Sequence, residues 1–105
     1  MTTFENSKGY KVLALSADEI RVWPRAEVCD RCDRKISSIG FYVGAFNLMY
    51  CPDCYEEWHA TAPEKQELLT QQEKKHMAKA IEYIDQIVNA KNSSKMSNNK
   101  PTGAL

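Results

Sequence analysis

The sequence predicts a small α+β protein. A short N-terminal strand and helical turn precede a cysteine-rich module, and a long amphipathic helix follows it. Two Cys-x-x-Cys pairs enclose eighteen residues that are rich in aromatic side chains and interrupted by glycine, a composition typical of short strands joined by turns. Residues 63–91 consist mainly of Glu, Gln, Lys, Ala, Leu and Ile, most of which favour helix. These observations define the order of the elements.

The length and charge of the chain limit what it can be. With 105 residues it has the size of one domain, and polar stretches at both ends leave only a thin hydrophobic core. Fourteen Lys and Arg balance fourteen Asp and Glu, so the molecule as a whole lacks the basic field that attracts nucleic acid or anionic lipid. No secretory leader and no apolar run of about 20 residues is seen. We therefore expect a soluble cytoplasmic protein without a membrane partner.

The N-terminal part divides into two segments. Residues 1–9 are polar and end in Gly9, so we expect a flexible start. Residues 10–24 begin with an apolar run, Tyr10 to Leu15, that predicts a strand packed on the cysteine-rich module. Ser16 to Glu19 form a capping box, and Pro24 limits the following helix to a turn that ends near Val22. A hairpin with residues 20–23 as its second strand is the alternative.

Residues 25–62 contain the cysteines. The runs 41–43 and 47–50 predict a β-hairpin, and Cys51 and Pro52 predict the start of a helix that ends near Thr61. Strand alternation places about half of the aromatic side chains inward. We expect Phe41, Val43, Leu48 and Trp58 in the core, and Tyr42, Phe46 and Tyr55 as candidates for an exposed partner surface.

The last two segments are a helix and a tail. Pro63 is placed to start the long helix 63–91, on which Leu69, His76, Ala80 and Ile87 share one face. This face packs on the module or on a second copy of the chain. Residues 92–105 are polar, and we expect them to form a disordered tail.

Cys29, Cys32, Cys51 and Cys54 are the candidate metal ligands. Paired Cys-x-x-Cys motifs in a reducing compartment are typical of zinc sites, because each pair can direct both sulfurs at one ion. Four thiolates complete a tetrahedral shell and leave no position for substrate, so we expect one structural zinc ion per chain. A thioredoxin-like role for Cys51 and Cys54 is the alternative, and it leaves the first pair unexplained.

The order of a cysteine knuckle, a hairpin and a helix that starts with the second pair resembles the treble-clef zinc fingers. Residues 29–36 and 50–55 look like half of a LIM domain and like the finger of the DksA/TraR type. The resemblance covers about a third of the chain and implies the four metal ligands. Its relatives bind proteins, RNA polymerase or DNA. Asp33 stands where such knuckles usually have glycine at positive φ.

The sequence indicates no catalytic residue. Neither His59 nor His76 has a spacing that replaces a cysteine ligand, and residues 41–50 lack the histidine that treble-clef nucleases need. The leading hypothesis is a non-enzymatic protein-interaction module, an adaptor or regulator, with a protein partner and with a homodimer through the long helix as a further option. The alternative is a nucleic-acid-binding or transcription-associated finger that uses basic residues, namely Arg21, Arg25, Arg31, Arg34 and Lys35.

Overall fold

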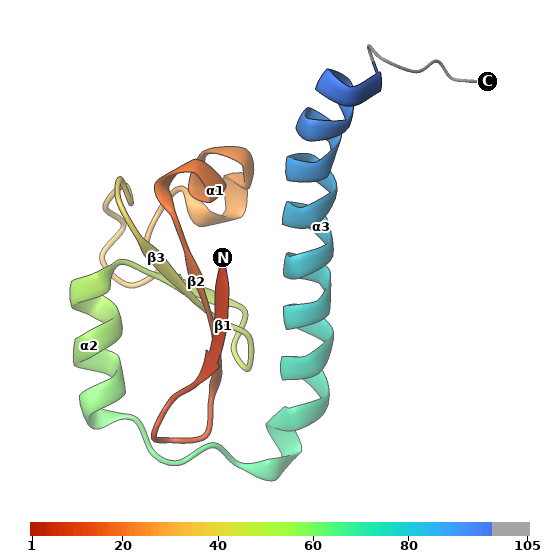
Figure 1. Cartoon of the computed structure of the whole chain (residues 1–105). Helices are drawn as coiled ribbons and strands as arrows, with labels where there is room; N and C mark the ends of the chain where they lie inside the picture. The colour runs from red at the N-terminus through yellow and green to blue at the C-terminus, as the bar shows by residue number, and fades with distance from the viewer. Residues whose placement is uncertain (98–105) are drawn as a thin grey trace.

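The computed structural model describes the backbone of residues 1–97 and the side chains of residues 1–88. Four strands form one antiparallel sheet in the order β1-β2-β3-β4. The strands are β1 (Thr2–Glu5), β2 (Lys11–Leu15), β3 (Gly40–Val43) and β4 (Leu48–Tyr50). The helices are α1 (Ala17–Val22), α2 (Pro52–Thr61) and α3 (Thr70–Ser97), with 3-10 turns η1 (Pro24–Ala26) and η2 (Glu67–Leu69). Helix α2 covers one side of the sheet and α3 the other, with α1 beside α3 (Figure 1).

The N-terminus is a strand, which corrects the expectation that residues 1–9 are flexible. Strand β1 pairs with β2, from Thr2 opposite Ala14 to Glu5 opposite Lys11. The turn between them is closed by Asn6, whose Oδ1 accepts the backbone N–H groups of Lys8 at 3.0 Å and Tyr10 at 3.1 Å. The polar composition of residues 1–9 gave no strand signal, because β1 forms through its pairing with the apolar strand β2.

The predicted strand and capping box of residues 10–24 are confirmed. The Oγ of Ser16 accepts the N–H of Glu19, and Oε1 of Glu19 accepts the N–H of Ser16 at 2.9 Å. The alternative hairpin is wrong, because residues 20–22 are helical. Strand β2 instead pairs with β3, with Leu13 opposite Tyr42. The N-terminal strands therefore extend the hairpin into a larger sheet.

Both faces of the sheet are covered, and this corrects the assignment of two aromatic residues. Tyr42 is 2% exposed and Tyr55 is 7% exposed, whereas Phe46 is exposed as expected. The ring of Tyr55 on α2 stacks on Phe41 with centroids 4.6 Å apart. On the opposite face Tyr42 packs edge-on against Trp23 at 5.1 Å. Alternation along β3 therefore separates two buried faces rather than a buried and a solvated one.

Helix α3 begins at Thr70 and not at Pro63. Tertiary contacts hold the preceding segment extended: the Tyr10 hydroxyl donates to the Pro63 carbonyl at 3.0 Å, and the Lys65 N–H donates to the Lys8 carbonyl at 2.8 Å. The helix also continues to Ser97, past the predicted end at 91. Of the predicted tail 92–105, residues 98–105 lie outside the described part. No described helix has an apolar stretch long enough to span a membrane.

Helix α3 is fixed to the turn between β3 and β4. The Gln72 side-chain amide donates to the Ala45 carbonyl at 2.6 Å, and His76 Nδ1 lies 2.8 Å from the Gly44 carbonyl oxygen. A Cβ atom on Gly44 would lie 2.5 Å from Cγ of Met77, so only glycine permits this approach. The helix therefore docks on the hairpin, as the first of the two packing options predicted.

Candidate metal centre

Four cysteine sulfurs from distant parts of the chain meet in one cluster. The Sγ atoms of Cys29, Cys32, Cys51 and Cys54 all lie within 4.8 Å of one another, and none is in a disulfide. Cys32 and Cys51 have their sulfurs 3.9 Å apart. Four thiolates at about 2.3 Å from a tetrahedral ion have sulfurs about 3.8 Å apart. The arrangement therefore fits one metal ion, and the predicted ligands are the residues that come together.

The first Cys-x-x-Cys pair lies in a tight knuckle. The N–H of Cys29 donates to the Arg34 carbonyl, and the N–H of Asp33 donates to the Cys29 carbonyl, both at 2.9 Å. Asp33 has a φ of 62°. This is the left-handed conformation expected where related knuckles have glycine, and Asp tolerates it better than most residues do. The knuckle also directs the Arg31 N–H at Cys29 Sγ, at 3.4 Å.

The second pair sits at the start of α2. Cys51 is the N-cap and Pro52 occupies the first helical position, where its missing N–H costs no hydrogen bond. Cys54 lies in the first turn. The N-terminal end of the helix therefore places partial positive charge beside the sulfurs.

Asp30 joins the knuckle to the sheet, and the sequence analysis missed this role. Its backbone N–H donates to the Met49 carbonyl at 2.7 Å, and its Oδ2 accepts the Met49 N–H at 2.7 Å. Arg25 Nη1 also donates to that oxygen, at 2.9 Å. An Asp between two cysteines gives no sequence signal for a strand contact, because Met49 lies nineteen residues away.

The two buried sulfurs have opposite electrostatic surroundings. Burial raises the pKa of Cys29, but backbone N–H groups of Cys51, Cys32 and Arg31 outweigh it and bring the pKa to about 7. Burial and hydrogen bonds with the neighbouring thiols raise the pKa of Cys54 to about 12. A divalent cation that binds all four sulfurs as thiolates displaces the protons of any that are thiols.

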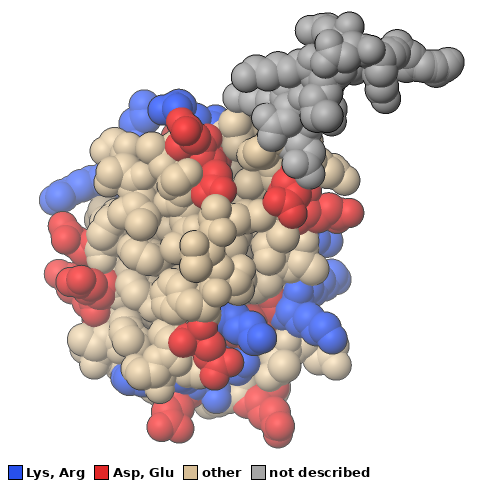
Figure 2. Space-filling model, viewed as in Figure 1, with Lys and Arg blue, Asp and Glu red and all other residues tan. Residues whose placement is uncertain are grey.

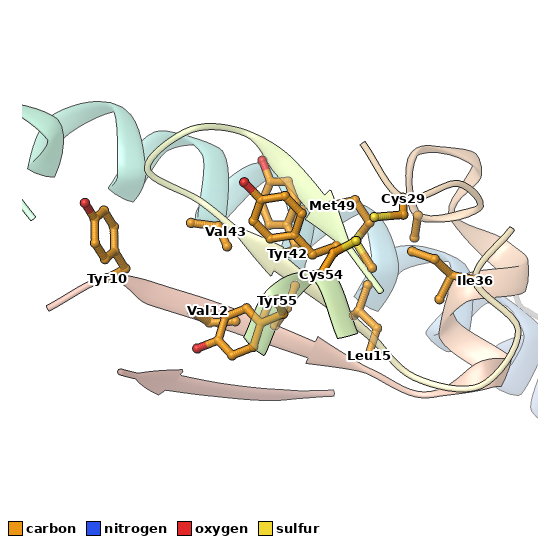
Figure 3. Packing of buried hydrophobic residues seen from close by; sticks show 14 of the residues in the cluster. Tyr10, Val12, Leu15, Cys29, Ile36, Tyr42, Val43, Met49, Cys54 and Tyr55 are labelled. Carbon is orange, nitrogen blue, oxygen red and sulfur yellow. The ribbon is translucent and has the colours of Figure 1, made fainter. Parts of the chain in front are cut away.

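The sulfurs differ in their access to solvent. Cys29 and Cys54 are buried, and Figure 3 shows their sulfurs among the core side chains near Met49. Cys32 and Cys51 are half-buried. A surface hollow of about 480 Å³ opens beside the cluster, and its lining comprises Arg31, Cys32, Arg34, Cys51, Asp53, Cys54 and Glu57.

Most of the candidate basic residues are paired with carboxylates. Arg21 pairs with Asp18 and Arg31 with Glu57, while Arg25 binds Asp30. Within residues 1–88, Arg34 and Lys35 make no ion pair. Arg31 and Arg34 line the hollow beside the cluster, so these two basic side chains lie next to the sulfurs.

The two histidines lie apart from the sulfur cluster. His59 Nε2 is 2.9 Å from Ser7 Oγ, and His76 binds the Gly44 carbonyl. His76 is half-buried on α3, as the helical pattern predicted. Neither side chain belongs to the cluster of candidate ligands.

Comparison of the chain with protein-family models, curated proteins and solved structures gives no significant match. The fold and the site therefore define the class by themselves: a mixed helix and sheet protein with a four-cysteine cluster suited to a metal ion.

Proposed function

We propose that the four cysteines hold one structural zinc ion in a treble-clef module. The observation that carries the proposal is the convergence of four sulfurs, two from the knuckle and two from the start of α2, within 4.8 Å. Thiolate sets favour zinc among the abundant divalent ions. The knuckle, the β3–β4 hairpin and α2 follow one another in the order of a treble clef, which supports this class.

The module is proposed to be non-enzymatic. Four thiolates fill the tetrahedral shell, so the ion has no open position at which to activate water or polarise a substrate. Zinc binding then acts on folding, because the free energy of binding becomes free energy of folding in a small domain. The free thiols agree with a reducing compartment, and we propose a cytoplasmic location.

The functional surface is proposed to bind another protein. Large apolar side chains are exposed on several elements, with Leu68 in η2 74% exposed and with Tyr83 and Val88 exposed on α3. Contiguous exposed apolar patches mark protein contacts, and these side chains are the candidates for such a patch. Helix α3, which projects past the sheet in Figure 1, offers the longest surface for a partner.

A nucleic-acid partner is the less favoured candidate. Three of the five basic residues are neutralised by neighbouring carboxylates. On the face shown in Figure 2 the two signs of charge alternate around an uncharged centre. A salt-dependent gel shift with non-specific DNA and RNA tests this candidate, since binding to phosphates weakens steeply as salt rises. No binding at low salt would exclude it.

Self-association through α3 is tested by sedimentation. Ile84 is buried against the core, whereas Val88, one turn further along the same face of α3, is 37% exposed and is the appropriate position for a charge. If α3 forms the dimer, Val88→Glu sediments as a monomer while the wild type sediments as a dimer. A monomeric wild type would contradict this use of α3.

The zinc proposal is tested on the purified chain. Metal analysis is expected to find one zinc per chain, and the four thiols are expected to resist alkylation until a chelator is added. A pull-down from the protein's own cell extract, with and without chelator, then tests the partner surface. Four freely reactive thiols in the zinc-supplemented protein would contradict the structural site.

A further inference from the structure

We infer that Cys32 and Cys51 form an oxidation site, in which hydrogen peroxide joins them in a disulfide across the two Cys-x-x-Cys pairs and releases the metal. The inference rests on the proposed zinc site. It assigns a covalent modification to two particular sulfurs of the four in the cluster.

The distance between the two sulfurs permits this pairing. The sulfurs of Cys32 and Cys51 are 3.9 Å apart, so a displacement of about 2 Å brings them to the disulfide distance of about 2.05 Å. They belong to the knuckle and to the N-cap of α2, respectively. Both positions lie at ends of their elements, where a small shift disturbs few backbone hydrogen bonds.

Access favours the same pair. Cys32 and Cys51 are half-buried and border the hollow beside the cluster, whereas Cys29 is completely buried and does not line it. Cys54 also lines the hollow, but it lies in the first turn of α2 and is only 7% exposed. A small neutral oxidant from solvent therefore meets Cys32 or Cys51 first, and the other of the two is its accessible neighbour.

The chemistry balances with peroxide as the only oxidant. Each of the two thiolates gives up one electron, and hydrogen peroxide takes both as its O–O bond breaks. One S–S bond forms, two metal–sulfur bonds break, and two protons from solvent complete two water molecules. Cys29 and Cys54 alone provide two ligands, too few to retain a tetrahedral site, so the ion leaves.

The disulfide keeps the knuckle tied to α2 after the metal is lost. It closes a loop that contains both strands of the β3–β4 hairpin. A covalent loop of this size stabilises the folded state because it lowers the conformational entropy of the unfolded chain. The oxidised protein is therefore expected to retain part of its structure and to recover zinc after reduction by a dithiol.

The test uses the full chain loaded with zinc and measured for zinc content beforehand. Peroxide is added in steps, released zinc is measured with a chromogenic chelator, and cysteine pairing is mapped by differential alkylation and peptide mass spectrometry. One zinc is expected per disulfide formed, with the link between Cys32 and Cys51. Dithiothreitol followed by zinc is expected to restore the starting state.

The pairing is decided on the zinc-loaded wild type, because variants that lack two of the four ligands are expected to lose the folded site. A disulfide between any two cysteines other than Cys32 and Cys51, or zinc release with only sulfinic acid formed, would overturn the inference. A chain that binds no zinc before peroxide is added would contradict the proposed function. The metal-release part of this inference would then be rejected as well.

Discussion

Glu73 on α3 is the buried charge on which docking of this helix is expected to depend. The residue is 1% exposed. Its Oε1 accepts a hydrogen bond from Lys65 Nζ at 2.8 Å, and its Oε2 accepts one from the Lys11 backbone N–H at 2.9 Å. One carboxylate therefore joins α3 to the segment before it and to the start of β2.

Replacing Glu73 by Gln keeps the size of the side chain and removes half of its accepting capacity. The amide oxygen can satisfy one of the two donors, while its NH₂ group faces the other. Loss of a charge-assisted hydrogen bond and one unsatisfied buried donor together cost about 2–3 kcal/mol. For a domain of this size the melting temperature is expected to fall by roughly 10 °C.

The measurement is urea and thermal unfolding of the zinc-loaded protein, followed by circular dichroism. Glu82→Gln, on an exposed position of the same helix, is the matched control and is expected to change stability by less than about 0.5 kcal/mol. A double-mutant cycle with Lys65→Met is expected to give a coupling energy above about 1 kcal/mol. Equal effects of Glu73→Gln and Glu82→Gln would refute the role assigned to the buried carboxylate.

Three further changes test the site and the sheet. Cys51→Ser removes one of four ligands and is expected to release the zinc and most of the folding stability of residues 25–62, as measured by metal analysis and unfolding. Asp30→Ala removes the contact with the Met49 N–H and is expected to weaken zinc binding about 10- to 100-fold in a chelator competition, because the knuckle loses its anchor. Burial raises the pKa of Tyr42 to about 12 from 10.0. The neutral phenol therefore contributes stability that is complete below pH 10 and lost as the pH rises to about 12, and Tyr42→Phe is expected to make this alkaline loss shallower in pH-dependent unfolding.

Each of these tests has a contrary outcome. A Cys51→Ser protein with full zinc content and native spectrum would contradict the ligand assignment. Asp30→Ala with wild-type zinc affinity would show that the knuckle needs no anchor on β4. An unchanged alkaline slope for Tyr42→Phe would assign the loss to the other tyrosines with raised pKa values, Tyr10 and Tyr50.

The parts that the sequence predicted are those set by local chemistry. The capping box at Ser16 and the helix start at Pro52 depend on neighbours within four residues, and both are present. The four cysteines were predicted as ligands because each Cys-x-x-Cys motif is a local signal, and because two such motifs together are typical of a metal site. Local signals of this kind do not depend on how the rest of the chain folds.

The parts that the sequence did not predict depend on distant partners. Pro63 is as suitable for a helix start as Pro52 is, but hydrogen bonds with the Tyr10 hydroxyl and the Lys8 carbonyl hold its segment extended. Tyr42 appeared exposed by alternation, but helices cover both faces of the sheet. Strand β1 has no apolar pattern and exists through its pairing with β2. In each case a tertiary contact overrides a local preference.

The metal site and the sheet are joined through the outer edge of β4. Met49 directs its N–H and its carbonyl at Asp30, so the knuckle satisfies the backbone groups that this edge strand would otherwise expose. At the other end of the hairpin, α3 holds the carbonyls of Gly44 and Ala45. The hairpin is therefore fixed at its edge by the knuckle and at its turn by the helix. In the proposed zinc-bound form, metal binding would order the knuckle and so protect β4. A small core would then be sufficient, because the ion stabilises one of the two supports of the hairpin.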